Sequence, residues 1–299
     1  MKDAPAAAAR FAARFTAELL LLEQPNTTLN CLVLCALRDR LLREEGFADC
    51  FATVKAEDNT KALLLMPALL AELDATPPAA RLQAVVEGVF AGNIFDLGAA
   101  NTAALHAAGT LDYHETRAKL QKRPWSVDDF DALTARFAGE PHKLAVLFVD
   151  NSGADVVLGM LPLARFLLQR GTRVILAANT VASINDVTAD EMLALLPRVA
   201  AFDAVFASAL ADGSVRVVAS GSDLPVIDLR YLSPELVRET AAADLIVLEG
   251  MGRAVESNLR ASFTVDALRL GMVKHAEVAA ALGDTPLFGC VCRFEAAAQ

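Results

Sequence analysis

Length, composition and charge already limit what this chain of 299 residues can be. Its 55% hydrophobic and 21% charged residues are typical of a globular protein rather than a disordered one. The formal net charge of −10, without a basic run, argues against binding to a nucleic-acid backbone, so we expect no nucleic-acid partner.

The mean hydropathy of +0.39 raises the question of a membrane span. The longest uninterrupted apolar run, 62–71, has ten residues and contains Pro67, whereas a spanning helix needs about 20. We therefore predict no membrane contact, and a cytoplasmic location is the default expectation. The sequence leaves a homo-oligomer open.

The N-terminal segment carries Lys2, Arg10 and Arg14, as a transit peptide would, but Asp3 and Glu18 interrupt the pattern. Apolar residues recur there at helical spacing: Phe11, Phe15, Leu19 and Leu22. This periodicity favours an amphipathic helix that docks on the core.

The five cysteines have spacings that a metal site could use. Cys31 and Cys35 would share a helix face, and Cys290 and Cys292 a strand face. Because no CxxC pair or adjacent histidine supports a metal, we expect reduced cysteines in the core.

The chain has two regions with different patterns of predicted secondary structure. From 5 to about 120 the pattern is helical, with breaks at 24–26 and 76–78. Ser126 and Asp129 resemble a capping box, and the helix that they would open ends at 139–141. We predict a helical subdomain over 1–125 and an α/β core over 126–299.

Strands and helices alternate after Pro141. Helices are expected over 154–170 and 275–282, after the Thr188–Glu191 capping box, and after Ser233. Strands are expected over 143–150, 173–178, 203–208, 214–220, 225–229, 244–249, 268–273 and 287–294. This alternation predicts a three-layer, mainly parallel α/β sheet of Rossmann-like type.

Polar residues gather where the predicted strands end. In open parallel sheets, ligands bind outside the carboxyl ends of the strands. The residues at these ends are Asp150, Asn151, Ser152, Asn179, Asn185, Asp186, Glu249, Gly250 and Lys274.

Each of these residues also has a purely structural explanation. Asp150 and Asn151 could cap the next helix, and Asn185–Asp186 could be an ordinary turn. Glu249 could pair with Arg253, and Lys274 could be a solvated strand end. Their convergence on one edge favours a functional site.

The residue types at this edge suit a metal and a phosphate. Two carboxylates and an amide carbonyl form an oxygen-rich site for a hard cation such as Mg²⁺ or Mn²⁺. A lysine, an arginine and glycine amides suit a phosphate group. Without a Ser/His/Asp or Cys/His set, this combination predicts metal-assisted phosphoester hydrolysis.

Three motifs resemble those of the damage-control phosphatase family. They are DNSGAD at 150–155, the step to Asp186 in NDVT, and EGMGR at 249–253, which marks the second subfamily. GNIFDLGA at 92–99 extends the resemblance into the helical half. The resemblance implies a divalent ion (Mg²⁺, Mn²⁺, Co²⁺ or Ni²⁺) and hydrolysis of a phosphomonoester, in this subfamily 4′-phosphopantetheine or its oxidised and damaged forms.

Site roles follow from the resemblance position by position. Asp150, Asn151 and Asp186 match the metal ligands, and Asp150 and Lys274 are the expected catalytic residues. The residues expected to bind substrate are Asn93, Asp96, Ser152, Asn179, Glu249, Gly250, Gly252, Arg253 and Lys274. Asp150 as a covalent nucleophile is a minority option, since Ser152 stands where such enzymes place a second acid.

Other functions remain open at this point. A sugar-phosphate phosphatase of the same family, or a non-catalytic module that binds a phosphorylated metabolite, would use the same residues. A dinucleotide-binding oxidoreductase is weakly suggested by Gly250 and Gly252, but Val255 replaces the third glycine. A methyltransferase lacks support beyond the lone Gly153 after the first strand.

Overall fold

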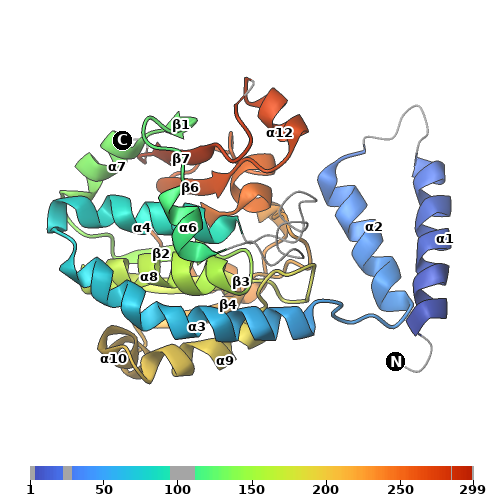
Figure 1. Cartoon of the computed structure of the whole chain (residues 1–299), viewed down its shortest axis with the longest axis horizontal. Coiled ribbons are helices and arrows are strands. Elements are labelled where there is room, and N and C mark those ends of the chain that lie inside the picture. The colour runs from blue at the N-terminus through green and yellow to red at the C-terminus, as the bar shows by residue number, and fades with distance from the viewer. Residues whose placement is uncertain (1–3, 23–28, 95–111, 284, 298–299) are drawn as a thin grey trace.

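A mixed seven-stranded sheet forms the centre of the computed structural model, which describes residues 4–22, 29–94, 112–283 and 285–297 (Figure 1). The strand order is β1-β7-β6-β5-β2-β3-β4. The strands are β1 (Val127–Asp128), β2 (Leu144–Phe148), β3 (Arg173–Ala178), β4 (Val215–Ala219), β5 (Leu245–Glu249), β6 (Asp266–Met272) and β7 (Cys290–Glu295). Only the β6–β7 pairing is antiparallel, so the predicted α/β class with a mainly parallel sheet is confirmed.

Two apolar clusters cover the two faces of this sheet and make three layers. Along β2, Ala145 and Leu147 pack into one cluster, while Val146 and Phe148 pack into the other. Burial on both faces explains why β2 is a continuous apolar run. On the first face lie α3 (Ala52–Ala75), α4 (Pro78–Asn93), α6 (Tyr113–Ala118), α7 (Phe130–Phe137), η1 (Asp155–Met160), α8 (Leu161–Gln169), α9 (Ala189–Ala200) and α10 (Ala204–Asp212). On the second face lie α11 (Pro234–Glu239), η3 (Met251–Glu256), α12 (Ala276–Ala281) and the short η2 (Leu229–Tyr231).

The first cluster contains residues of α3 and α4 together with residues of the strands. The helical half and the sheet therefore share one apolar core. The division into subdomains over 1–125 and 126–299 stays a prediction.

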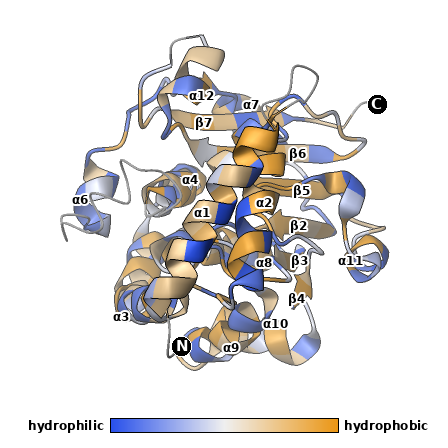
Figure 2. Cartoon of the chain, turned by 90° about the vertical axis from the view of Figure 1, so that its right-hand side faces the viewer, coloured by the Kyte–Doolittle hydropathy of each residue, from blue (hydrophilic) through white to orange (hydrophobic). Residues whose placement is uncertain are grey.

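The two N-terminal helices stand apart from these layers. In Figures 1 and 2, α1 (Ala4–Leu22) and α2 (Cys31–Glu44) lie beyond the carboxyl ends of the strands, with α1 outermost. The predicted helix near the N-terminus is confirmed, but its predicted docking on the core is wrong. Of the α1 residues only Ala7 is buried, and Arg14 pairs with Glu44 and Glu45 at the end of α2.

Two predicted strands are wrong. Residues 203–208 belong to α10, because Asp203 caps the helix by accepting a hydrogen bond from the Phe206 N–H, and Gly213 ends it with φ 75°. Residues 225–229 pair with no strand in the described part of the chain, and η2 begins at Leu229 after the Asp228 cap.

The predicted capping box at Ser126 is also wrong. Strand β1 begins at Val127, and α7 begins only at Phe130. The Asp128 carboxylate accepts hydrogen bonds from the Trp125 and Phe130 N–H groups, so it organises this turn instead. The Ser126 hydroxyl donates to Gln121.

All five cysteines are free, but only Cys290 and Cys292 lie in the core. The core position predicted for the others is wrong: Cys31 and Cys50 are exposed and Cys35 is half-buried. Among the described residues, no helix has both the length and the apolar character that crossing a bilayer requires.

Close packing of α4 on η1 generates a stability prediction. A Cβ on Gly92 would lie 2.8 Å from the Ala154 carbonyl oxygen and 2.9 Å from the Asp155 Cα, both backbone atoms. We expect Gly92→Ala to lower the free energy of unfolding by about 1–3 kcal/mol, measured by denaturant titration. The control is Gly88→Ala on the same helix, whose new Cβ would come no closer than 3.3 Å, to the Tyr113 hydroxyl. Equal stabilities of the two variants would contradict the prediction.

Candidate active site

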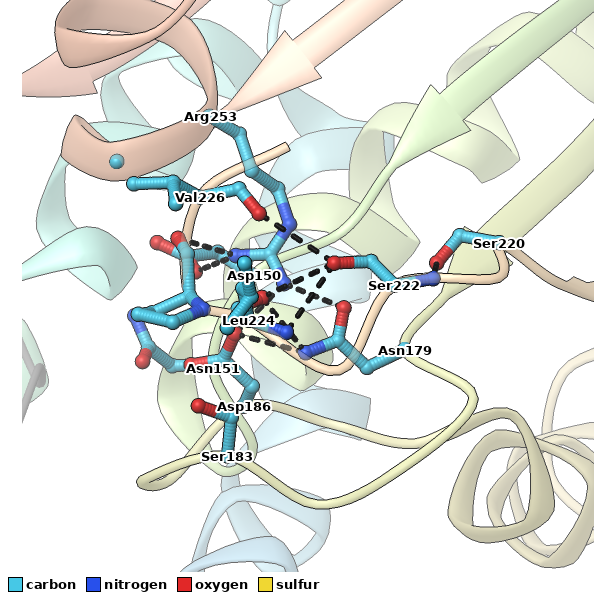
Figure 3. A network of polar contacts seen from close by, with 12 residues as sticks. Asp150, Asn151, Asn179, Ser183, Asp186, Ser220, Ser222, Leu224, Val226 and Arg253 are labelled. Carbon is cyan, nitrogen blue, oxygen red and sulfur yellow. Dashed lines mark hydrogen bonds and ion pairs between the residues drawn. The ribbon is translucent and has the colours of Figure 1, made fainter. Parts of the chain in front are cut away.

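The carboxyl edge of the sheet brings two distant loops together. After β2 the Asp150 carbonyl accepts a hydrogen bond from the Val187 N–H at 2.9 Å, and Asn151 pairs with Asp186 across an antiparallel bridge. The loop that carries Asp186 therefore lies beside the end of β2 (Figure 3). The three residues predicted to bind a metal, Asp150, Asn151 and Asp186, are adjacent.

An arginine from η3 lies between the two acids. The Arg253 guanidinium forms ion pairs with Asp150 and, through Nη2 at 2.6 Å, with Asp186. Burial alone would lower the pKa of Arg253, but the charges of Asp186 and Asp150 raise it above its ordinary value. Arg253 is therefore fully charged, and it holds both carboxylates in place.

Asn179, at the end of β3, positions the same arginine and acid. Its Oδ1 accepts a hydrogen bond from Arg253 Nη2 at 3.0 Å, and its Nδ2 donates to Asp186 Oδ2 at 3.1 Å (Figure 3). A further bond runs from Nδ2 to the Leu224 carbonyl at 3.0 Å. These bonds make Asn179 a positioning residue for Asp186; its contact with a substrate stays a prediction.

Behind Asp150 lies a second pair of acids, Asp155 and Glu249. Glu249 Oε2 accepts a hydrogen bond from the Asp150 N–H at 3.0 Å. Asn93, at the end of α4, donates from Nδ2 to Glu249 Oε1 at 2.8 Å and to Asp155 Oδ2 at 3.1 Å. Asn93 thus connects the helical half of the chain to the site. Glu249 does not form the ion pair with Arg253 that would have given it a purely structural role.

Lys274 follows β6 and has no exposed surface, so a solvated lysine is the wrong explanation for it. Its positive charge acts on Asp155 and Glu249, where it lowers the pKa of both carboxyl groups. Burial has the larger effect: it raises the pKa of Asp155, and with the charges of Asp155 and Asp150 it raises the pKa of Glu249 well above its ordinary value. A direct contact between Lys274 and a phosphoryl group stays a prediction.

The charges of this cluster do not balance. Four carboxylates face two cations, which leaves a formal charge of 2 − 4 = −2, and none of the six residues exposes more than 4% of its surface. They are Asp150, Asp155, Asp186, Glu249, Arg253 and Lys274. A divalent cation would offset this charge, and three of the acids, Asp150, Asp155 and Glu249, bring carboxylate oxygens within 4.8 Å of one another. The donor set therefore fits a hard divalent ion.

Two glycines of the EGMGR segment let the backbone approach the acids. Gly250 has φ +94°, and a Cβ there would lie 1.9 Å from Asp150 Oδ2. A Cβ on Gly252 would lie 2.3 Å from the Pro225 carbonyl oxygen, which also accepts a hydrogen bond from Arg253. The segment is thus shaped around Asp150 and Arg253.

A small cavity of about 110 Å³ opens over Asp150 and Asn151. Its opposite wall is one face of α2, formed by Cys31, Cys35 and Arg38. The Arg38 guanidinium is fixed there by two hydrogen bonds to Asp39, at 2.6 and 2.9 Å, and one to the Ser183 hydroxyl at 3.2 Å. A cation therefore lines the space above the acids.

Sequence reasoning missed Asp155 and Arg38. Asp155 was visible, because it follows Asn151 by four residues and its Oδ2 accepts a hydrogen bond from Asn151 Nδ2 at 2.8 Å. Nothing local in the sequence connects Arg38 with an edge more than 100 residues away. Of the other predicted residues, Asp96 lies outside the described part of the chain. Ser152 is buried, and its hydroxyl has no hydrogen-bond partner among the described residues.

The geometry of Gly250 generates a prediction about the metal. We expect Gly250→Ala to displace Asp150 and to weaken Mn²⁺ binding at least about tenfold in calorimetric titration, because the new methyl group would overlap its carboxylate. The control is Gly213→Ala, which has a similar φ of +75° but no atom within 4 Å of the new Cβ. Loss of Mn²⁺ binding in both variants, or in neither, would contradict this account.

Comparison with known proteins identifies the family of this chain. Residues 2–286 match the model of the damage-control phosphatase ARMT1-like domain. The chain is 44% identical to Damage-control phosphatase At2g17340 of Arabidopsis thaliana, over 98% of this chain and 80% of that protein. It is 43% identical to Pantothenate kinase 2 of Arabidopsis thaliana, over 98% of this chain and 36% of that protein.

Two further comparisons concern a mammalian relative and the fold. The chain is 35% identical to the 4′-phosphopantetheine phosphatase of Mus musculus, over 90% of this chain and 39% of that protein. The crystal structure of a DUF89 family protein from Pyrococcus horikoshii shares the fold, with a TM-score of 0.67 at 16% identity over 98% of this chain and 90% of the other. The predicted resemblance to the damage-control phosphatases is therefore confirmed, and the chain belongs to the damage-control phosphatase ARMT1-like family.

Proposed function

We propose that this protein is a metal-dependent phosphatase that removes phosphate from 4′-phosphopantetheine or its oxidised and damaged forms. Membership of a phosphatase family supports hydrolysis of a small phosphorylated molecule. The name of the mouse relative, which is 35% identical to this chain over 39% of its own length, supports this particular substrate.

One observation carries the proposal of a metal: the deficit of two positive charges among buried side chains beneath a cavity. Burying carboxylates whose total charge is not balanced is costly, and burial raises the pKa of Asp155 and Glu249. A divalent ion next to them, with a phosphate above it, would resolve this imbalance.

We assign the ion to Asp150, Asn151 and Asp186, which match the metal ligands of the family; Asp155 and Glu249 lie beside Asp150 and add negative charge to the same site. Asn151 donates its Nδ2 to Asp155, which leaves Oδ1 to serve as a ligand. When bound, a divalent ion neutralises phosphoryl charge and lowers the pKa of a water molecule enough for it to attack phosphorus. The candidate ions are Mg²⁺, Mn²⁺, Co²⁺ and Ni²⁺.

Arg38, which lines the cavity, would bind the phosphoryl oxygens, and two buried cations lie among the acids below. Arg253 reaches both proposed metal ligands, Asp150 and Asp186, and Arg38 lines the opposite wall. Lys274 supplies positive charge near Asp155 and Glu249. We propose that this charge stabilises the negative charge that develops on the phosphoryl group in the transition state. This mechanism requires no covalent phosphoryl intermediate on Asp150.

Removal of one proposed metal ligand tests the mechanism. We expect Asp186→Asn, which keeps the shape of the side chain but loses its charge, to abolish Mn²⁺ binding in calorimetry. Phosphate release from p-nitrophenyl phosphate should fall at least about 100-fold. The control is Asp190→Ala, an exposed acid four residues further on. If the unaltered protein kept full turnover after exhaustive chelation, the metal mechanism would be wrong.

A comparison of substrates tests the second half of the proposal. We expect kcat/KM to be at least about tenfold higher for 4′-phosphopantetheine than for fructose or ribose phosphates, a difference of about 1.4 kcal/mol in transition-state binding. Steady-state phosphate release measures it. The reverse order would identify a sugar-phosphate phosphatase. Binding of these esters without turnover in the presence of all four metals would identify a non-catalytic binding module.

A further inference from the structure

A second, larger cavity of about 650 Å³ adjoins the cavity over Asp150. Cys31, Val226 and Glu256 line both spaces, so the larger cavity begins where the smaller one ends. We call the larger cavity the α2 groove. Its walls are the first turn of α2, residues 226–230, and residues 256–258 and 261–263 at and after the end of η3.

The floor of the α2 groove is tied to the proposed active site by buried polar side chains. Asn258 donates hydrogen bonds to the Arg253 carbonyl at 2.9 Å and to the Ile227 carbonyl at 3.1 Å. Arg269, which has no exposed surface, donates to the Asn258 carbonyl at 2.8 Å and also to the Ala261 carbonyl. The groove is therefore a preformed feature whose floor is fixed relative to Arg253.

The chemistry of the walls limits what can bind. Apolar side chains, among them Leu32 and Phe263, alternate with the hydrogen-bonding groups of Asn30, Ser257 and Ser262. The charged residues of the lining are Asp228, Glu256 and Arg230, a formal charge of 1 − 2 = −1. This balance disfavours a second phosphate in the groove, and the mixed lining suits a chain with both amide and apolar segments.

We propose that the α2 groove binds the organic part of the phosphomonoester whose phosphate lies at the metal site, and that this part is an elongated, uncharged chain with amide groups. The proposal rests on the proposed phosphatase function. It makes the N-terminal turn of α2 a determinant of specificity, and it disfavours esters that carry a nucleotide.

Filling the groove tests this inference in the full-length protein with Mn²⁺. Ser262→Trp would place an indole ring in the groove, and Leu32→Trp would do so from α2. In both variants we expect the ratio of kcat/KM for 4′-phosphopantetheine to that for p-nitrophenyl phosphate to fall about tenfold, mainly through KM for the longer ester. The matched control is Thr264→Trp, an exposed position two residues from Ser262 that lines neither cavity and should leave the ratio unchanged.

The outcomes separate the groove from the proposed function. An unchanged ratio in both groove variants would overturn the groove. Calorimetric titration of 4′-phosphopantetheine onto the unaltered protein and Ser262→Trp gives an answer that needs no turnover. Tenfold weaker binding to the variant would support the groove even if neither ester were hydrolysed, a result that would reject the phosphatase alone. Equal affinity would reject the groove alone, whereas no binding to either protein would reject both the groove and the proposed substrate.

Discussion

The structure depends on the burial of four carboxylates at one edge of a parallel sheet. Like charges at close range repel one another strongly in a medium of low polarity, so each acid needs a donor or a cation. Arg253 joins Asp150 to Asp186, and Asn93 joins Asp155 to Glu249. Much of the surrounding chain is arranged to supply these partners: the end of α4, the end of β3, and the glycine-containing turn after β5. The remaining negative charge is what makes the site suitable for a metal.

Local patterns in the sequence predicted the sheet because its central strands are continuous apolar runs. The prediction for β3, residues 173–178, agrees with the structure at both ends, and the Thr188–Glu191 capping box is present as expected. The errors occur where an apolar run forms a helix rather than a strand, or where a strand is very short. Residues 203–208 were apolar enough for a strand, but the Asp203 cap and the Gly213 end give a helix instead. Strand β1 has only two residues and depends on β7, which no local pattern reveals.

The site was predictable to the extent that its residues follow strands. Asp150, Asn151, Asp186, Glu249 and Lys274 were found because parallel strands deliver their carboxyl ends to one edge. What the sequence could not reveal is how these residues are bonded. A pair between Glu249 and Arg253 was only the structural alternative, and Glu249 instead accepts hydrogen bonds from Asn93 and the Asp150 backbone. Arg38 was invisible for a related reason, since the position of α2 depends on tertiary contacts such as that between Arg38 and Ser183.

The hydrogen bond between Asn93 and Glu249 joins residues that are 156 positions apart. During synthesis on the ribosome, at roughly 5–20 residues per second, Asn93 therefore emerges about 8–30 s before its partner. Asp150 also precedes Glu249, by 99 positions, and until then its backbone lacks this acceptor. The acidic edge can close only when β5 and β6 have been translated and have entered the sheet. Until that moment the nascent chain carries a growing negative charge in water, and the final packing of α4 must wait for the last third of the protein.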